Sequence, residues 1–242
     1  MSRMRTVARK ELSAYFNSPI AYVFLLVFAG AALFTFFNIE AFFARGRADM
    51  RGLFEAIPFL TLLLVPALTM RLWAEEQKQG TLEVLLTLPA RDHELVAGKF
   101  LAGLGLLAAG LALTMMLPLS LSVAGVGNFD WGPILGGYLG ALLLGGAYLS
   151  LGQFISALTE NQILAFILAF VVCLALFGLG TDPFTRLFSD QTAGLLRALG
   201  TGSRFSSIAR GVIDLRDLVY YASLTATFLL LNVCALRAKR WA

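Results

Sequence analysis

The sequence predicts an all-α integral membrane protein with six transmembrane helices. Of its 242 residues, 58% are hydrophobic and only 14% are charged, whereas about a quarter of the residues in an ordinary soluble domain carry charge. A helix needs about 20 apolar residues to cross the hydrocarbon core of a bilayer. The chain supplies such stretches one after another, separated by short polar breaks, and they are continuously apolar, as membrane helices require.

We expect a single transmembrane domain over residues 1–242. The spans are predicted at 20–39, 56–73, 99–123, 133–158, 162–180 and 218–236. Both terminal tails are rich in Lys and Arg, and an even number of spans places them on the same side of the membrane. Because basic flanks stay on the cytoplasmic side, both termini are expected in the cytoplasm. Contact with lipid headgroups explains the net charge of +4 more simply than nucleic acid does.

Ahead of the first span, residues 4–17 predict an amphipathic helix in the cytoplasmic interface of the membrane. Five apolar residues share one face of this helix: Met4, Val7, Ala8, Leu12 and Tyr15. The helix also carries the basic residues Arg9 and Lys10. Glu11 lies in the middle of the apolar face, where an unpaired carboxylate is costly. It either reaches out to water or pairs with a basic residue of the neighbouring loop or of a partner subunit.

The fourth predicted span carries Gly132, Gly136 and Gly140 at four-residue spacing. Small residues at this spacing let helix backbones approach closely, either within the chain or between two subunits.

The segment between the last two spans, residues 181–217, is unusually long. Apolar residues follow helical spacing within it: Phe205, Ile208, Ala209, Val212 and Ile213. This pattern predicts an amphipathic helix over about 204–214 on the outer surface of the membrane.

Composition also disfavours two classes of function. The centres of the predicted spans hold none of the ionisable residues that ion-coupled transporters use. His93 is the single histidine, so no histidine pair is present to build a metal site. The phosphate-binding motif GxxxxGK[ST] is missing, so we expect no cofactor on this chain, and a separate chain has to bind any ATP that is used.

The loop between the second and third spans predicts a partner. It reads AEEQKQGTLEVLLTLPARDHELVAGK, in which Gly80 ends the extension of the second span, Thr81 can start a short helix and Pro89 ends it. The short helix is mostly apolar and too short to be stable alone. Either it tucks against the membrane interface or the ends of the spans, or it is a coupling helix that docks in a groove of a soluble subunit.

At these residues the chain resembles the ABC-2-type exporter permeases, and in particular the subgroup typified by the gliding-motility-associated permease. The resemblance rests on four stretches: RKELSAYFNSPIAYVF, LVPALTMRLWAEEQKQGTLEVLLTLP, ISALTENQI and FSSIARGVIDLRDLVYY. It implies a permease subunit of an ATP-binding cassette exporter in the bacterial cytoplasmic (inner) membrane. A membrane scaffold doing mechanical or assembly work, or an ion-coupled secondary transporter, remains the alternative.

The resemblance also implies partners. Two ATPase subunits would bind ATP and Mg, and a second permease, either a copy of this chain or a related one, would complete the membrane unit. An accessory protein with a periplasmic domain is a further implied partner. The ATPase contact is expected at Glu75, Glu76, Gly80, Thr81, Glu83, Leu85 and Leu86, with a second, smaller contact at Glu160. The substrate stays unidentified and would pass between subunits, beside the second and fifth spans.

Overall fold

The computed structural model describes residues 3–40, 49–87, 90–125, 129–179, 181–185, 190–211 and 214–240. All regular elements in these ranges are helices, and six are long and apolar enough to cross a membrane. They are α2 (Pro19–Phe34) with its π-helical continuation η1 (Thr35–Ile39), α4 (Arg51–Thr69), α7 (Asp92–Val123), α8 (Trp131–Leu158), α9 (Gln162–Leu179) and α13 (Leu215–Arg240). The protein is therefore an all-α, multi-pass integral membrane protein, as predicted.

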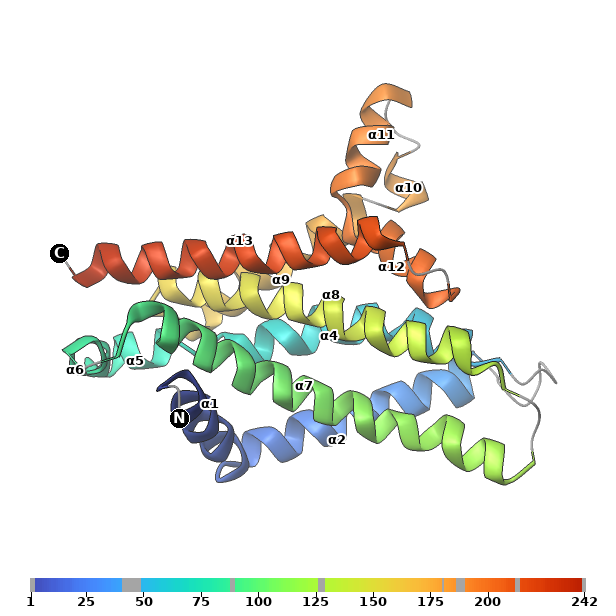
Figure 1. The fold of residues 1–242 in the computed structure, drawn as a ribbon, viewed down its shortest axis with the longest axis horizontal. Coiled ribbons are helices and arrows are strands. Elements are labelled where there is room, and N and C mark those ends of the chain that lie inside the picture. The colour runs from blue at the N-terminus through green and yellow to red at the C-terminus, as the bar shows by residue number, and fades with distance from the viewer. Residues whose placement is uncertain are drawn as a thin grey trace.

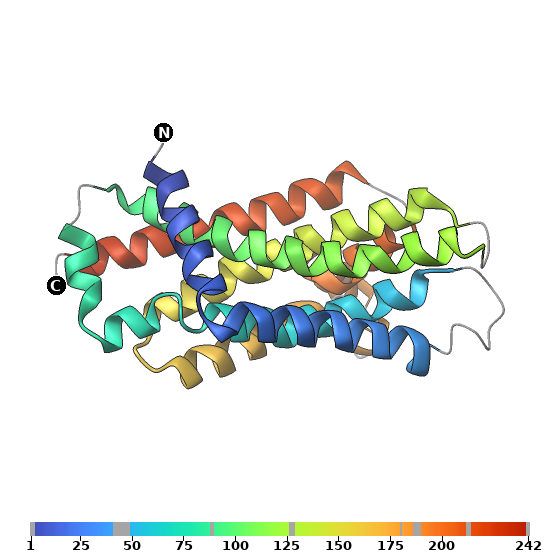
Figure 2. The same ribbon diagram turned by 90° about the horizontal axis from the view of Figure 1, so that it is seen from below.

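The spans form an elongated bundle, and both chain termini lie at the same end of it (Figure 1). We call this end the terminal end. It also holds the short helices α1 (Arg3–Phe16), α5 (Ala74–Lys78) and α6 (Thr81–Thr87) (Figure 2). The opposite end, the distal end, holds α12 (Thr201–Ala209) and the first residues of α4, α8 and α13. From there α10 (Asp182–Thr185) and α11 (Asp190–Leu199) project sideways from the bundle (Figure 1).

Several helices extend further into polar sequence than predicted, whereas α4 ends at Thr69, before the predicted end at residue 73. Helix α4 begins at Arg51 rather than at residue 56, and α7 begins at Asp92 rather than at residue 99. Helix α13 continues to Arg240, past the predicted end at residue 236. The prediction counts only apolar residues, whereas backbone hydrogen bonding carries these three helices past the apolar stretch.

Helix α8 is the most buried span and packs against α4, α7, α9, α12 and α13. Glycines let these helices approach it. A Cβ at Gly137 would lie 2.5 Å from the Phe54 ring of α4, and one at Gly152 would overlap the Thr69 hydroxyl of the same helix. Because the two glycines have no side chains, side chains of α4 reach the backbone of α8, and α8 is the frame on which the other helices pack.

The predicted glycine stripe is only partly a packing surface. A Cβ at Gly140 would lie 2.9 Å from Ile208 of α12, so this glycine faces a helix of the same chain, and Gly136 is buried. Gly132 is exposed in the first turn of α8, where its amide donates to Asp130 at 3.0 Å. Within the described ranges only Asp130 comes within 4 Å of a Cβ there, so Gly132 packs against no other helix of this chain and belongs to the capped turn. Packing of Gly132 between two subunits stays a prediction.

The predicted outer helix is shorter, begins earlier and lies elsewhere than expected. Helix α12 spans Thr201–Ala209 rather than 204–214, and Gly211, with φ of +87°, follows it in a turn that other residues rarely adopt. The predicted members Val212 and Ile213 lie outside the described residues. The short helices α10 and α11, which the sequence analysis did not predict, precede α12.

The apolar face of α12 packs on the bundle rather than on the membrane surface. Phe205 and Ile208 are buried in the hydrophobic core. Two tyrosines hold the start of the helix: Tyr148 and Thr201 share a hydrogen bond of 2.8 Å, and the Tyr221 hydroxyl donates to the Thr201 carbonyl at 2.8 Å. An amphipathic pattern gives only one apolar face, and here protein covers that face.

Replacing Gly152 with Ala tests the role of α8 as the frame. The new methyl group would overlap the Thr69 hydroxyl, so we expect overpacking to cost about 1–3 kcal/mol of stability and to lower the melting temperature in detergent. Gly30→Ala in α2 is the matched control, because its Cβ would meet no described atom within 4 Å and should leave melting unchanged or slightly raised. Equal melting of Gly152→Ala and wild type would contradict this packing.

Candidate functional site

A buried ammonium group joins three elements at the terminal end. The Lys99 side chain, on α7, is only 3% exposed. Its Nζ lies 2.7 Å from Glu76 Oε1 of α5 and 3.2 Å from Glu11 Oε1 of α1, and it sits over the Trp73 ring at 4.8 Å from the centroid. Burying a charge is costly unless it is paired, and here two carboxylates and an aromatic face surround the cation. We call Lys99, Glu11, Glu76 and Trp73 the Lys99 cluster.

Helix α1 packs along α7 through the predicted apolar face. A Cβ at Gly98 would lie 2.6 Å from Val7 Cγ1, so only glycine allows this close approach. Arg9 and Lys10 are exposed. Of the two alternatives for Glu11, the structure contains the ion pair. Its carboxylate pairs with Lys99 of the same chain, at the end of the segment between the second and third predicted spans.

The turn between α4 and α5 is fixed by Ser156 of α8. The Ser156 hydroxyl accepts hydrogen bonds from the amides of Trp73 and Ala74, both at 3.1 Å, and donates to the Met70 carbonyl at 3.0 Å. Gln77 donates to the Ala157 carbonyl at 3.2 Å, at the end of α8. Helix α5 is therefore held to the bundle although it has only five residues.

The two glutamates of α5 have different partners. Glu76 faces Lys99, whereas Glu75 accepts two hydrogen bonds from the Arg71 guanidinium, at 2.7 and 3.0 Å. Both carboxylates are thus engaged within the chain and half-buried. They fix the orientation of α5, and the more exposed surface next to them is formed by Lys78, Gln79 and Gly80.

Helix α6 rests its apolar face on the ends of the spans. Gly80, with φ of +69°, turns the chain between α5 and α6, and Thr81 Oγ1 donates across the turn to the Glu76 carbonyl at 3.3 Å. Leu82 is buried and Leu85 half-buried in a cluster that contains Trp73. The side chain of the predicted contact residue Leu86 lies outside the described part of the structure.

The described residues of α6 that are exposed to solvent are polar: Thr81, Glu83 and Thr87. Within this chain, Leu82 and Leu85 pack against the ends of the spans, which fixes the helix in place. Docking of the helix on a soluble subunit stays a prediction.

The turn between α8 and α9 lies beside α5. Glu160 is exposed in this turn, and it lines one cavity together with Lys78, Asn161, Gln162 and Ile163. Asn161 caps α9 by accepting a hydrogen bond from the Ile163 amide at 2.9 Å. Lys78 and Glu160 thus line one cavity, and α6 follows α5 across the Gly80 turn. We call the two segments expected to contact an ATPase the docking face: Lys78, Glu83 and Glu160 with the residues around them.

The comparisons with known proteins agree with this architecture. The family model described as ABC-2 family transporter protein matches residues 5–182. The chain belongs to the ABC-2 transporter family. The match includes α1, the α5–α6 segment and the turn at Glu160, so it covers the Lys99 cluster and the docking face. No curated protein matches the chain. The ABC-2 chain is a membrane component of an ABC transporter, and its family lacks an ATPase site of its own.

The last helix of this ABC-2 chain, which lies beyond the match, closes the terminal end. Arg237 and Arg240 of α13 lie 3.5 and 3.3 Å from the carboxylate of Asp92, the first residue of α7, and Lys239 donates to Gln77 Oε1 of α5. Sequence reasoning noticed the basic tail but assigned it to lipid. Only the fold brings Asp92 and Gln77 to it.

Replacing Lys99 with Met tests the cluster. The substitution leaves two carboxylates unpaired in a mostly buried site, so we expect a loss of about 3 kcal/mol in stability and faster trypsin cleavage at Arg9 and Lys10 as α1 detaches. Lys78→Met, an exposed lysine of α5, is the control and should behave as wild type.

The double variant Lys99→Met/Glu76→Gln should recover part of the lost stability, because one of the unpaired charges is then gone. Unchanged melting and unchanged cleavage in Lys99→Met would show that the ion pairs do not hold α1.

Proposed function

We propose that this chain is the permease subunit of an ABC exporter whose two ATPase subunits are separate chains that dock on the docking face. The observation that supports this most is the position of α6: Leu82 and Leu85 anchor it on the bundle, and its described polar residues are exposed. A polar surface on a firmly held element suits a partner that stays soluble on its own. The terminal end is then cytoplasmic, both termini are inside the cell, and the membrane is the bacterial inner membrane.

In this proposal the Lys99 cluster transmits movement of the docking face to the spans. When ATP and Mg bring the paired ATPases together, a push on α6 reaches α5 through the Gly80 turn. From α5 it reaches α1 and α7 through the Lys99 ion pairs, and α4 through the turn that Ser156 fixes. The spans then pivot as rigid bodies, and a path opens at the interface between two permeases, beside α4 and α9. The second permease is a copy of this chain or a related one.

The energy for export comes from ATP in this proposal. Among the described residues the buried charged side chains are Asp92, Lys99 and Asp217. Asp92 and Asp217 lie in the first turn of their helices, and Lys99 lies about two turns into α7. A proton- or sodium-coupled carrier needs an ionisable group deeper in the bundle. The gliding-motility-type subgroup, with an accessory protein that has a periplasmic domain, remains the resemblance that best fits the chain.

A pull-down from solubilised native membranes tests the proposal. Tagged wild type should co-purify an ATPase, and Glu83→Lys and Glu160→Lys should each reduce the recovered ATPase about tenfold, because charge reversal at a contact costs at least about 1.4 kcal/mol. Both residues are exposed, so the fold should be retained. Arg216→Glu, an exposed charge reversal at the distal end, is the control. Absence of any ATPase with the wild type in several mild detergents would overturn the proposal.

A further inference from the structure

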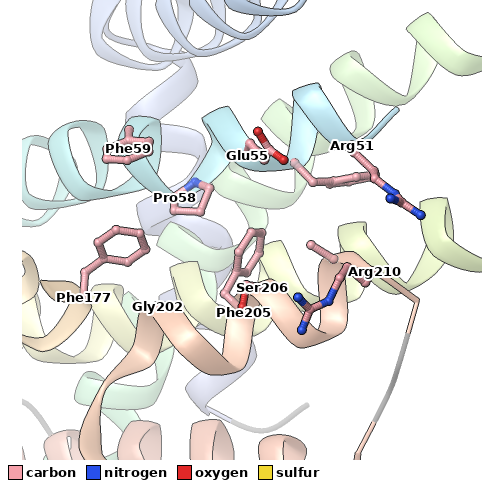
Figure 3. Close-up of a pocket in the computed structure, with 11 residues that line it drawn as sticks. Arg51, Glu55, Pro58, Phe59, Phe177, Gly202, Phe205, Ser206 and Arg210 are labelled. Atoms are coloured by element: carbon pink, nitrogen blue, oxygen red, sulfur yellow. The ribbon is translucent and has the colours of Figure 1, made fainter. Parts of the chain in front are cut away.

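The distal end contains a pocket of about 340 Å³ between α4, α9 and α12. This volume falls within the range of small-molecule sites. Aromatic rings from all three helices line it: Phe54, Phe59, Phe177 and Phe205. Two arginines, Arg51 and Arg210, complete its rim (Figure 3).

The pocket is polarised along the bundle. Arg51 is the first residue of α4, and Phe59 lies eight residues later, or about 12 Å deeper along the helix axis. Arg210 follows the last residue of α12. Figure 3 shows both guanidinium groups at one end of the pocket, while Phe59 and Phe177 lie at the other end, where their rings meet at 5.5 Å between centroids. One end of the pocket is therefore cationic and the other aromatic.

The two arginines form few ion pairs within the described part of the chain. Arg51 pairs with Asp49 at 3.4 Å, but its side chain is 63% exposed, and such surface pairs contribute little. Arg210 is exposed and has no ion-pair partner among the described residues. Glu55 also lies on the rim, so the pocket carries two positive charges and one negative charge. Guanidinium groups bind phosphate oxygens in bidentate fashion and are well suited to hold a phosphate here.

The aromatic end opens toward the membrane. Phe59 is 62% exposed although it lies well within a membrane span, so it faces the surroundings of the bundle, which are lipid chains. A molecule that enters from the side therefore meets aromatic rings at chain depth and arginines at the end of the span. This order matches the order of apolar chain and headgroup in a phospholipid.

We propose that the pocket binds a membrane lipid with a phosphate headgroup, its chain along the phenylalanines and its phosphate between Arg51 and Arg210. Resting on the exporter function proposed above, this lipid is the class of substrate that the permease moves, and the pocket is its station on the outer side of the membrane.

The test uses the full chain, purified in a maltoside detergent, which contains no phosphate. Native mass spectrometry measures how much added phosphatidylglycerol is retained, compared with diacylglycerol of the same chains. We expect wild type to retain phosphatidylglycerol about tenfold better than diacylglycerol. Arg51→Gln/Arg210→Gln should abolish this preference, and Ser206→Trp, which fills the pocket from an exposed position, should reduce retention of both lipids.

Controls separate this proposal from its alternatives. Arg216→Gln, an exposed arginine of the distal end that does not line the pocket, should keep the preference. Displacement of the lipid by millimolar inorganic phosphate would overturn the lipid assignment, and an unchanged preference in the double Gln variant would overturn the site. ATPase recovery is measured on the same variants. Lost lipid preference with retained ATPase leaves the exporter function standing. Missing ATPase with an intact preference overturns the exporter function and the substrate role of the lipid, and leaves the lipid site standing.

Discussion

The terminal end of the bundle depends on the buried ammonium group of Lys99. Water reaches almost none of this side chain, so the free energy of burying its charge has to be offset by Glu11, Glu76 and the ring of Trp73. These partners come from α1, α5 and the turn before α5, whereas Lys99 itself belongs to α7. Moving any one of these elements alone would leave a charge unpaired in a mostly dry site. The elements that face a partner and the spans behind them are therefore mechanically one unit.

Helix α8 anchors this unit to the rest of the bundle. Its glycines allow α4, α7 and α12 to approach its backbone, and near its terminal end polar side chains replace the glycines. Gln153 donates to the Val96 carbonyl of α7 at 3.0 Å, and Ser156 binds the turn before α5. One helix thus combines apolar close packing over most of its length with hydrogen bonds at the point where the chain leaves the span. This explains how a five-residue helix such as α5 can be held firmly.

Sequence patterns predicted features that depend on a single helix. The six spans and the face of α1 follow from local spacing, and the cost of burying charge left two alternatives for Glu11, water or an ion pair. Sequence patterns could not predict features that depend on contact with a second helix. Four-residue spacing selected Gly132, but only the fold shows that Gly137 and Gly152 face α4. The apolar face of α12 has the same pattern whether lipid or protein covers it. Lys99, the partner of Glu11, is far from it along the chain, so local spacing could not identify the pair.

The distance between α1 and the turn that joins α5 to α6 tests most directly whether these elements move as one unit. Double electron–electron resonance can measure it in the complex purified with its ATPases, with spin labels at Arg9→Cys and Gln79→Cys, both exposed positions, in a Cys173→Ala/Cys234→Ser background. We predict one narrow distance distribution that stays the same when a non-hydrolysable ATP analogue closes the ATPases. A distribution that shifts or broadens with the nucleotide would contradict the account, because α1 would then move independently of the docking face.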